Sequence, residues 1–235
     1  MALTLVPTTS ASAHGSCALP VFGPGSNYHP HIVPSDFTAN VTNPWYPLKV
    51  NRALIYAGDR EGQNALDIVL TTSRTKLIDG VRTRVVSDRL YLDGVLSERT
   101  NDYFAQDRCG NVWYFGEDTA ELDAHGRVVS REGSFHAGVD GAEAGVFMQA
   151  HPQLGRKFRQ EWYRDQAEDV FQVIGKNTTV TVPLGTFHHA LRTAETTRLE
   201  PGTLDNKYYV RGIGEVAELT VKGPPEALRL LAIIP

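Results

Sequence analysis

The sequence contains very little cysteine: only Cys17 and Cys109 among 235 residues. This scarcity excludes a scaffold with several disulfides and a zinc site built from thiolates. Basic residues are also in the minority, with 23 lysines and arginines against 27 acidic residues and a net charge of −4. Proteins that bind nucleic acids need a basic surface, so we expect no nucleic-acid partner.

Long apolar runs and enzyme signatures are absent as well. No segment approaches the roughly 20 apolar residues that a membrane-spanning helix requires, so no transmembrane segment is expected. The sequence has no glycine-rich phosphate loop, no Gly-x-Ser-x-Gly and no His-Glu-x-x-His. These absences argue against nucleotide enzymes, common hydrolases and zincins, and we expect no cofactor.

The N-terminus indicates export. A short apolar run, Ala2–Val6, is followed by small residues that end in Ala11-Ser12-Ala13, a pattern typical of a signal-peptide cleavage site. We therefore expect residues 1–13 to be a signal-peptide remnant, His14 to start the mature chain, and the protein to be secreted or extracytoplasmic. In an oxidising compartment, Cys17 and Cys109 could form a disulfide; the alternative is two unpaired thiols.

Residues 14–50 are expected to form an extended arm, because they are rich in proline and lack periodicity. Residues 51–235 are expected to form one all-β domain, an antiparallel meander of about ten strands that closes into a barrel or a strongly curved half-barrel. Asp-Gly and Asp-x-x-Gly turns separate the first runs of β-forming residues. The expected strands are Arg52–Ala57, Asn64–Leu77, Val81–Leu92, Val95–Gln106, Val112–Leu122, Arg127–Phe135, Lys157–Arg164, Val170–Ile174, Thr178–Val182, His188–Thr197, Lys207–Arg211, Glu215–Lys222 and Leu228–Ile234. We expect Gly138–Gly155 to be a long connection, and Gln166–Val173 is the one weak helical candidate.

The stretch Asn101–Asp118 predicts a hairpin around a type I turn at Asp107–Gly110. Two registers are open. With a three-residue turn, Ala105 faces Trp113, Tyr103 faces Phe115 and Asn101 faces Glu117, and the turn residues favour this register. With two loop residues, Asp102 faces Glu117 directly, which is unfavourable unless the carboxyls share a proton or a cation.

Several motifs in the sequence resemble those of a family of secreted bacterial proteins of unassigned function. They are Asn43-Pro44-Trp45-Tyr46-Pro47-Leu48, Asp107-x-x-Gly110-Asn111-Val112-Trp113-Tyr114-Phe115-Gly116-Glu117, Arg159-Gln160-Glu161, Val182-Pro183-x-Gly185-Thr186-Phe187, Leu199-Glu200-Pro201 and Lys207-Tyr208-Tyr209-x-x-Gly212-x-Gly214. Two of these motifs also resemble those of periplasmic half-barrels related to lipoprotein carriers. That resemblance implies a curved antiparallel sheet whose concave face accepts a ligand, and it implies no particular reaction.

Four charged residues, Asp102, Glu117, Arg159 and Glu161, are the candidate catalytic set because they lie in strands beside aromatic residues. Strand alternation predicts that Arg159, Glu161 and Tyr163 share one face. A carboxyl group inside a barrel could have a raised pKa and act as a general acid or base. The alternative is a structural ion pair or a solvent-facing row.

Aromatic residues with a few polar groups are typical of a small-molecule cavity, although they also form ordinary β-cores. The candidate ligand-binding residues are Trp45, Tyr46, Gln106, Trp113, Tyr114 and Tyr163. The histidines match no zinc-site spacing, so no metal site is expected. A copper site at His14 would require cleavage after Ala13.

The sequence therefore predicts a secreted barrel that binds a small, partly apolar ligand. One alternative is a barrel enzyme of the lyase, isomerase or cyclase type, with Glu117 or Glu161 as acid–base and Arg159 as anion stabiliser. Another is an envelope protein that only contacts other proteins. Binding is favoured because no nucleophile–base pair is evident, and the oligomeric state is not predicted.

Overall fold

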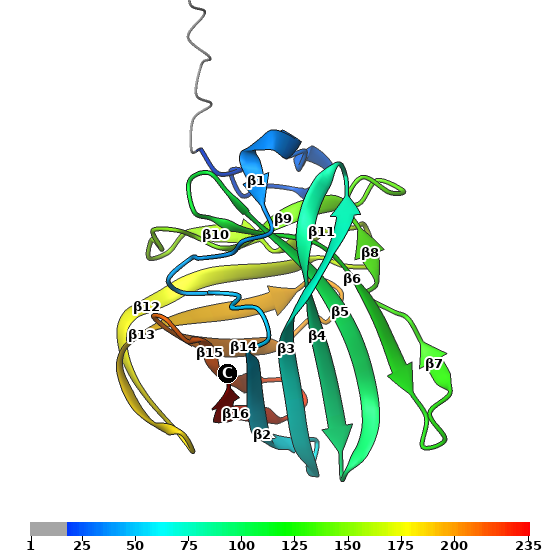
Figure 1. Cartoon of the computed structure of the whole chain (residues 1–235), viewed down its shortest axis with the longest axis vertical. Coiled ribbons are helices and arrows are strands. Elements are labelled where there is room, and N and C mark those ends of the chain that lie inside the picture. Colours follow the sequence, from blue (N-terminus) through cyan, green and yellow to red (C-terminus); the bar gives the residue numbers. More distant parts are fainter. Residues whose placement is uncertain (1–17) are drawn as a thin grey trace, which may run out of the picture.

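The computed structural model describes residues 18–235, and nearly all of their regular structure is antiparallel β-sheet (Figure 1). The chain's elements are η1 (Gly25–Asn27), η2 (Pro34–Asp36), β1 (Phe37–Thr38), β2 (Ala53–Arg60), β3 (Gln63–Ile78), β4 (Val81–Leu92), β5 (Val95–Asp107), β6 (Val112–Leu122), β7 (Val128–Ser130), β8 (Phe135–His136), β9 (Glu143–Met148), β10 (Lys157–Arg159), β11 (Glu161–Trp162), β12 (Asp169–Val182), β13 (Gly185–Thr197), β14 (Leu204–Val210), β15 (Gly214–Lys222) and β16 (Glu226–Ile234). They form one sheet of 16 strands. The all-β fold class is confirmed, but about ten strands was too few.

The hairpins of the first half follow the turn signals in the sequence. At Asp79-Gly80 and Asp93-Gly94, both turn residues have positive φ, as a two-residue type I′ turn requires. The strands β3, β4, β5 and β6 consequently lie close to their expected ranges. The β2–β16 pairing then joins this half to the C-terminal strands, which curves the sheet toward a barrel (Figure 1).

Four expectations about the second half of the sheet are wrong. The supposed connection Gly138–Gly155 contains β9, and the helical candidate Gln166–Val173 runs into β12. The expected strand Arg127–Phe135 is replaced by the two short strands β7 and β8. Residues 170–174 and 178–182 belong to a single long strand, β12, which carries several bulges against β13. Glycine and other small residues have a low strand propensity. Strands that contain many of them, such as β9, therefore lack the run of β-forming residues by which a strand is predicted.

The sheet nearly closes on itself through one short segment of chain. Its two terminal strands are β10, which pairs with β12, and β11, which pairs with β9. Only Gln160 separates these strands in the sequence, and its N–H donates to the carbonyl of Asp169 at 2.8 Å. The segment 157–162 therefore borders both ends of the sheet.

Gly145 is expected to be essential for this closure. A Cβ atom at Gly145 would lie 2.2 Å from the backbone C and O of Gln160 and 2.5 Å from the N of Glu161. Because backbone cannot yield as a flexible side chain does, we expect Gly145→Ala to lower the unfolding free energy by about 2 kcal/mol or more. Urea unfolding would measure this loss. Gly23→Ala is the matched control, since no atom lies within 4 Å of its added Cβ; equal stability of the two variants would contradict the role of Gly145.

The segment before β2 is attached to the barrel by polar contacts. The side-chain oxygen of Gln106 accepts hydrogen bonds from the backbone N–H groups of Thr42 and Asn43 at 2.8 and 2.7 Å. The amide of Asn43 donates to the carbonyls of Gly110 and Gln149. These contacts fix the position of Tyr46, which enters the barrel. The predicted signal peptide, His14 and Cys17 all lie outside the described residues, so the Cys17–Cys109 disulfide stays a prediction.

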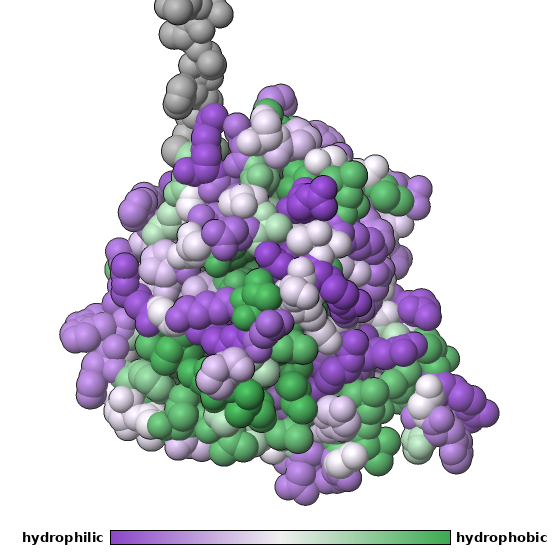
Figure 2. All heavy atoms as spheres, viewed as in Figure 1, coloured by the Kyte–Doolittle hydropathy of each residue, from purple (hydrophilic) through white to green (hydrophobic). Residues whose placement is uncertain are grey.

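The outer surface is not uniformly polar. Figure 2 shows apolar side chains gathered over the lower part of the face in view. The exposed apolar residues include Leu66 and Leu70 of β3 and Leu231 and Ile234 of β16. Residues 18–235 include no helix of the length and apolarity that a bilayer crossing would demand.

Candidate functional site

The barrel encloses a cavity of about 510 Å³, which is in the size range of small-molecule sites. Residues from nearly every long strand line it, and so does Tyr46 from the segment before β2. Twelve of the lining side chains are carboxyls and only three are basic. The carboxyl residues are Asp67, Asp88, Glu98, Asp102, Glu117, Glu161, Asp169, Glu195, Glu200, Glu215, Glu218 and Glu226.

A bulge in the β5–β6 hairpin brings two of the predicted site residues together. The turn forms as expected, with the N–H of Gly110 donating to the carbonyl of Asp107 at 2.9 Å. The pair Ala105–Trp113 confirms the favoured register near the turn. Phe115 is then an extra residue opposite the Tyr103–Phe104 step, and Gly116 has the positive φ of 144° that the bulge uses.

Beyond the bulge, the second register holds. Gly116 pairs with Tyr103 and Asp102 lies directly opposite Glu117, so the expected pairs Tyr103–Phe115 and Asn101–Glu117 are wrong. The bulge also reverses the strand alternation, which lets Tyr114 and Glu117 both line the cavity although they are three residues apart. Two carboxyls facing each other in this way favour binding of a proton or a cation.

A second bulge has the same effect on β15. The pairing of β14 with β15 shifts between Tyr208 and Tyr209, and as a result Glu215 and Glu218 both line the cavity. Regular alternation would place residues three apart on opposite faces. Neither glutamate was therefore among the predicted site residues, although a bulge signal in the Tyr-Tyr-x-x-Gly-x-Gly motif could have indicated them.

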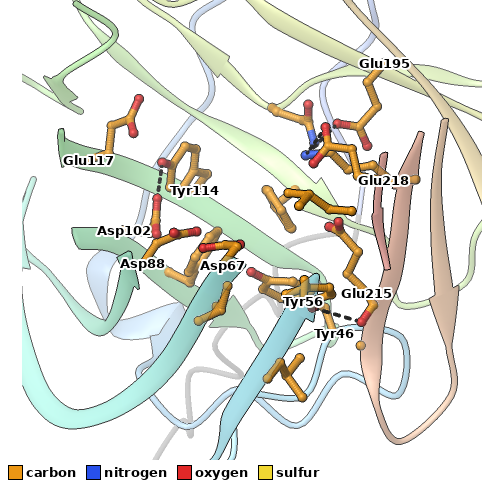
Figure 3. Close-up of a pocket in the computed structure, with 18 of the residues that line it drawn as sticks. Tyr46, Tyr56, Asp67, Asp88, Asp102, Tyr114, Glu117, Glu195, Glu215 and Glu218 are labelled. Atoms are coloured by element: carbon orange, nitrogen blue, oxygen red, sulfur yellow. Dashed lines mark hydrogen bonds and ion pairs between the residues drawn. The ribbon is translucent and has the colours of Figure 1, made fainter. Parts of the chain in front are cut away.

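One wall of the cavity, here called the acidic wall, consists of Asp67 of β3, Asp88 of β4 and Asp102 of β5 (Figure 3). Burial raises the pKa of Asp67 to about 6, although a hydrogen bond from Asp88 lowers it. Burial and the charge of Asp67 raise the pKa of Asp88 well above its usual range. Burial and the charge of Asp88 raise the pKa of Asp102 to about 7, and the Tyr114 hydroxyl donates to this carboxyl at 2.7 Å. The acidic wall therefore holds protons near neutral pH.

Glu117 and Glu161 lie beside the acidic wall and also line the cavity. Burial raises the pKa of Glu117 well above its usual range, and the charges of Asp102 and Glu98 add to this effect. Burial likewise raises the pKa of Glu161, with further contributions from Asp169 and Glu117. A raised pKa is one requirement for a carboxyl that acts as a general acid.

The opposite wall includes Glu195 and Glu218 (Figure 3). It also carries the one lysine that lines the cavity. Lys207 of β14 lies 3.4 Å from Glu195 of β13 and 3.4 Å from Glu218 of β15. Burial disfavours the charged amine, but the charges of Glu195, Glu218 and Glu215 outweigh it and raise the pKa of Lys207. This wall is therefore partly neutralised, whereas the acidic wall has no ion pair within residues 18–235.

Aromatic rings form the floor of the cavity. Tyr46, Phe104, Tyr114 and Phe147 contact one another, with ring centroids 4.6 Å apart for Tyr46–Phe147 and 4.8 Å apart for the stacked Phe104–Tyr114 pair. All four residues line the cavity. We call them the aromatic floor; it offers an apolar surface next to the carboxyls of the acidic wall.

Arg159 does not lie in the cavity, contrary to expectation. Its guanidinium donates to the carbonyl of Gly23 at 2.9 Å and stacks 4.6 Å from the ring of Trp162 and 5.4 Å from that of Phe22. The chain bends at Gln160 between β10 and β11, so alternation does not carry over from Arg159 to Glu161. The expectation that Arg159 and Glu161 share one face is therefore wrong.

Arg159→Met is expected to weaken the fold and leave the cavity unchanged. The variant loses one hydrogen bond and two cation–π contacts, which together correspond to about 1–2 kcal/mol of unfolding free energy. Urea unfolding would measure the loss, and binding of the neutral dye N-phenyl-1-naphthylamine would test the cavity. The exposed Arg131→Met is the control. A loss of dye binding in Arg159→Met alone would contradict this placement.

Four of the six predicted ligand-binding residues also lie away from the cavity. Trp113 donates its indole N–H to Asp107 and packs against Phe37. Gln106 holds the segment before β2, and Trp45 packs under Arg211. Tyr163 forms a β-bridge with Ala167 and is not among the residues that line the cavity. Only Tyr46 and Tyr114 of this set line the cavity, together with Asp102, Glu117 and Glu161 of the charged set.

Four histidines of the described residues contact polar side chains. His29 lies 2.9 Å from Glu143, and His136 lies 2.9 Å from Asp118. His188 contacts Thr179, and His189 contacts Asn177. Over residues 18–235, no group of three or more His, Cys, Asp or Glu side chains is arranged to hold a metal ion.

Comparison with known proteins gives two similarities of structure. No protein-family model and no curated protein matches the sequence. A Bacteroides fragilis protein described as exported, with a YmcC-like fold, matches with a TM-score of 0.47 and 10% identity over 81% of this chain and 99% of its own. A Parabacteroides distasonis protein described as a lipoprotein matches with a TM-score of 0.43 and 9% identity over 80% of this chain and 97% of its own. The fold assignment rests on the strand pairings given above.

Proposed function

We propose that this chain is an extracytoplasmic binding protein that holds a small, partly apolar ligand inside the barrel. The carrying observation is the cavity of about 510 Å³, in which the aromatic floor adjoins hydrogen-bonding carboxyls. Such a combination buries an apolar ligand body and orients it by a few polar groups. The location outside the cytoplasm rests on the Ala11-Ser12-Ala13 pattern.

Binding of N-phenyl-1-naphthylamine, followed by its fluorescence, tests the proposal. We expect a saturable site at one dye per chain. Phe147→Ala removes part of the aromatic floor and should weaken the dye about tenfold. Phe37→Ala is the matched control, because Phe37 packs against Trp113 and Phe115 away from the cavity. No saturable binding, or equal loss in both variants, would contradict the proposal.

A second candidate is an enzyme of the lyase, isomerase or cyclase type. Its supporting observation is that Glu117 and Glu161 face one cavity and that burial raises the pKa of both. Arg159 cannot serve as its anion stabiliser, because it contacts Gly23 and Trp162 instead. Native mass spectrometry of protein from a secreting host separates the candidates: a ligand recovered unchanged supports binding, and its conversion during incubation supports catalysis.

A further inference from the structure

The charge of the cavity differs from that of the whole chain. The chain carries a net charge of only −4, yet the cavity gathers twelve carboxyls and three basic side chains. Burial of unpaired carboxylates is costly. Their presence in the cavity therefore points to a function that requires them. The chemistry of the ligand that the proposed binding site accepts can therefore be inferred from these groups.

The three basic side chains already have partners. Arg52 donates to the carbonyls of Pro47, Gly212 and Ile213. Arg60 lies 3.7 Å from Glu98 and from Glu226. Lys207 is shared by the opposite wall, as described above. None of these cations forms an ion pair with the acidic wall, which depends on bound protons or on an added cation.

Asp67 provides an independent indication of a missing partner. The residue is only 8% exposed, and although its carboxyl shares a hydrogen bond with Asp88, its Oδ1 has no hydrogen-bond partner among the described residues. Asp67 lines the cavity, and in Figure 3 it lies between Asp88 and the two tyrosines Tyr46 and Tyr56. A buried carboxyl oxygen without a donor is rare in native proteins. An N–H donor from a ligand would satisfy this atom.

The aromatic floor suits the same kind of ligand. Burial raises the pKa of Tyr46, and the nearby charge of Asp102 raises it further. Tyr114 donates its hydroxyl to Asp102. Both rings therefore lie close to the acidic wall. Aromatic faces attract organic cations through their quadrupole, and the effect grows when water is excluded. Carboxyls and rings side by side therefore favour a positively charged nitrogen on an apolar body.

The arrangement is less suited to a metal ion. Calcium is held by six to eight converging oxygens, whereas the carboxyls of this cavity are spread over separate strands. In the part of the chain that the structure describes, no three of them converge as metal ligands do. An extended organic cation can instead reach a carboxyl and an apolar surface at the same time.

We propose that the cavity selects small organic amines, with the ammonium group bound by Asp67, Asp88 and Asp102 and the apolar body packed on Tyr46, Phe104 and Tyr114. This inference rests on the proposed binding function and deepens it. Because the acidic wall holds protons near neutral pH, an incoming ammonium group displaces them. Binding therefore releases protons and becomes tighter as the pH rises from 6 to 8.

Isothermal titration calorimetry with three ligands of one shape tests the proposal. Tryptamine, tryptophol and indole-3-propanoate share an indole ring and a two-carbon spacer, and they end in a cation, a neutral hydroxyl and an anion. At pH 7.5 we expect tryptamine to bind at least tenfold more tightly than tryptophol, and indole-3-propanoate to bind most weakly. Titrations in phosphate and in HEPES, which differ in ionisation enthalpy, should show proton release for tryptamine alone.

Asp102→Asn and Asp67→Asn should each reduce the preference for tryptamine over tryptophol to about threefold or less. Glu132→Gln is the control, because Glu132 is an exposed carboxyl outside the barrel. Equal or tighter binding of tryptophol or indole-3-propanoate overturns the amine selectivity and leaves the proposed function standing. If N-phenyl-1-naphthylamine binds but none of the three indole ligands does, the amine selectivity likewise fails and the proposed function stands. If neither the dye nor the three ligands bind, the proposed function fails together with the inference.

Discussion

The free energy of unfolding is expected to fall by about 3 kcal/mol as the pH rises from 5 to 8. Most proteins lose stability toward acid, because their carboxyls are paired in the folded state. Here burial raises the pKa of Asp67 and of Asp169 to about 6, and that of Asp102 and of Glu218 to about 7. Their ordinary values lie near 4, so the folded chain keeps protons that the unfolded chain has lost.

The sign of the effect follows from this difference in bound protons. Between about pH 4 and 7 the folded state binds more protons than the unfolded state, and stability therefore falls as the pH rises. The contribution of these groups is fully present below pH 4 and is lost as the pH passes their folded pKa values. For Asp67 alone, the change from 3.8 to about 6 corresponds to about 3 kcal/mol. Carboxyls that contact water in the cavity contribute less than a fully buried one. We therefore expect a total loss of about 3 kcal/mol for the four carboxyls together.

Groups with a lowered pKa act outside this pH range. Burial raises the pKa of Asp118, but hydrogen bonds from Tyr103 and Lys76 outweigh it, and Arg198 lowers the pKa of Glu168. Their stabilisation is lost only as the pH falls below about 4. The stability maximum should therefore lie near pH 4.

Urea unfolding at pH 5, 6, 7 and 8 measures the predicted slope. The double variant Asp67→Asn, Asp102→Asn should have less than half of the wild-type slope, and it should be at least as stable as the wild type at pH 8. Glu132→Gln should retain the full slope. An unfolding free energy that is constant or rises from pH 5 to 8 would show that the acidic wall is ionised without cost.

The regular parts of the fold could be predicted from the sequence, because their signals are local. Asp79-Gly80 and Asp93-Gly94 form the expected turns, and β-forming residues between them form β4. β9 could not be predicted, since its Gly145 is explained only by a tertiary contact, the close approach to the backbone of Gln160. The closure of the sheet at Gln160 is a tertiary effect of the same kind.

The candidate site was predictable only in part, because bulges and a break between strands interrupt the regular alternation of the strands. Asp102, on a regular stretch of β5, was placed correctly in the barrel. Glu215 and Glu218 were missed because a bulge in β15 brings residues of opposite parity to one face. Arg159 was misplaced because alternation was extended across the break at Gln160. Composition identifies polar strand residues, but the bulges decide which face they occupy.

Lys207→Met is expected to lower the unfolding free energy by about 3 kcal/mol at pH 8. Lys207 pairs directly across from Glu218 in the β14–β15 register, and its amine lies 3.4 Å from both Glu218 and Glu195. Methionine keeps the length of the side chain but removes the charge. Two enclosed carboxylates then lose their common cation, and removal of one partner from a buried ion pair typically costs 3–5 kcal/mol.

The effect of Lys207→Met should depend on pH. At pH 5, Glu218 is protonated in the folded state, since burial raises its pKa to about 7 even with Lys207 nearby. The loss at pH 5 should therefore be less than half of the loss at pH 8. The double variant Lys207→Met, Glu218→Gln removes one of the two stranded charges and should recover at least half of the stability at pH 8.

Lys222→Met is the matched control, because Lys222 is an exposed lysine at the end of the neighbouring strand β15. It should change the unfolding free energy by no more than about 0.5 kcal/mol. Urea unfolding of the four proteins at pH 5 and pH 8 separates charge from packing: a packing defect in Lys207→Met would be independent of pH and would not be repaired by Glu218→Gln. If Lys207→Met and Lys222→Met are equally stable at pH 8, the carboxyls of this wall do not depend on Lys207 for their compensation.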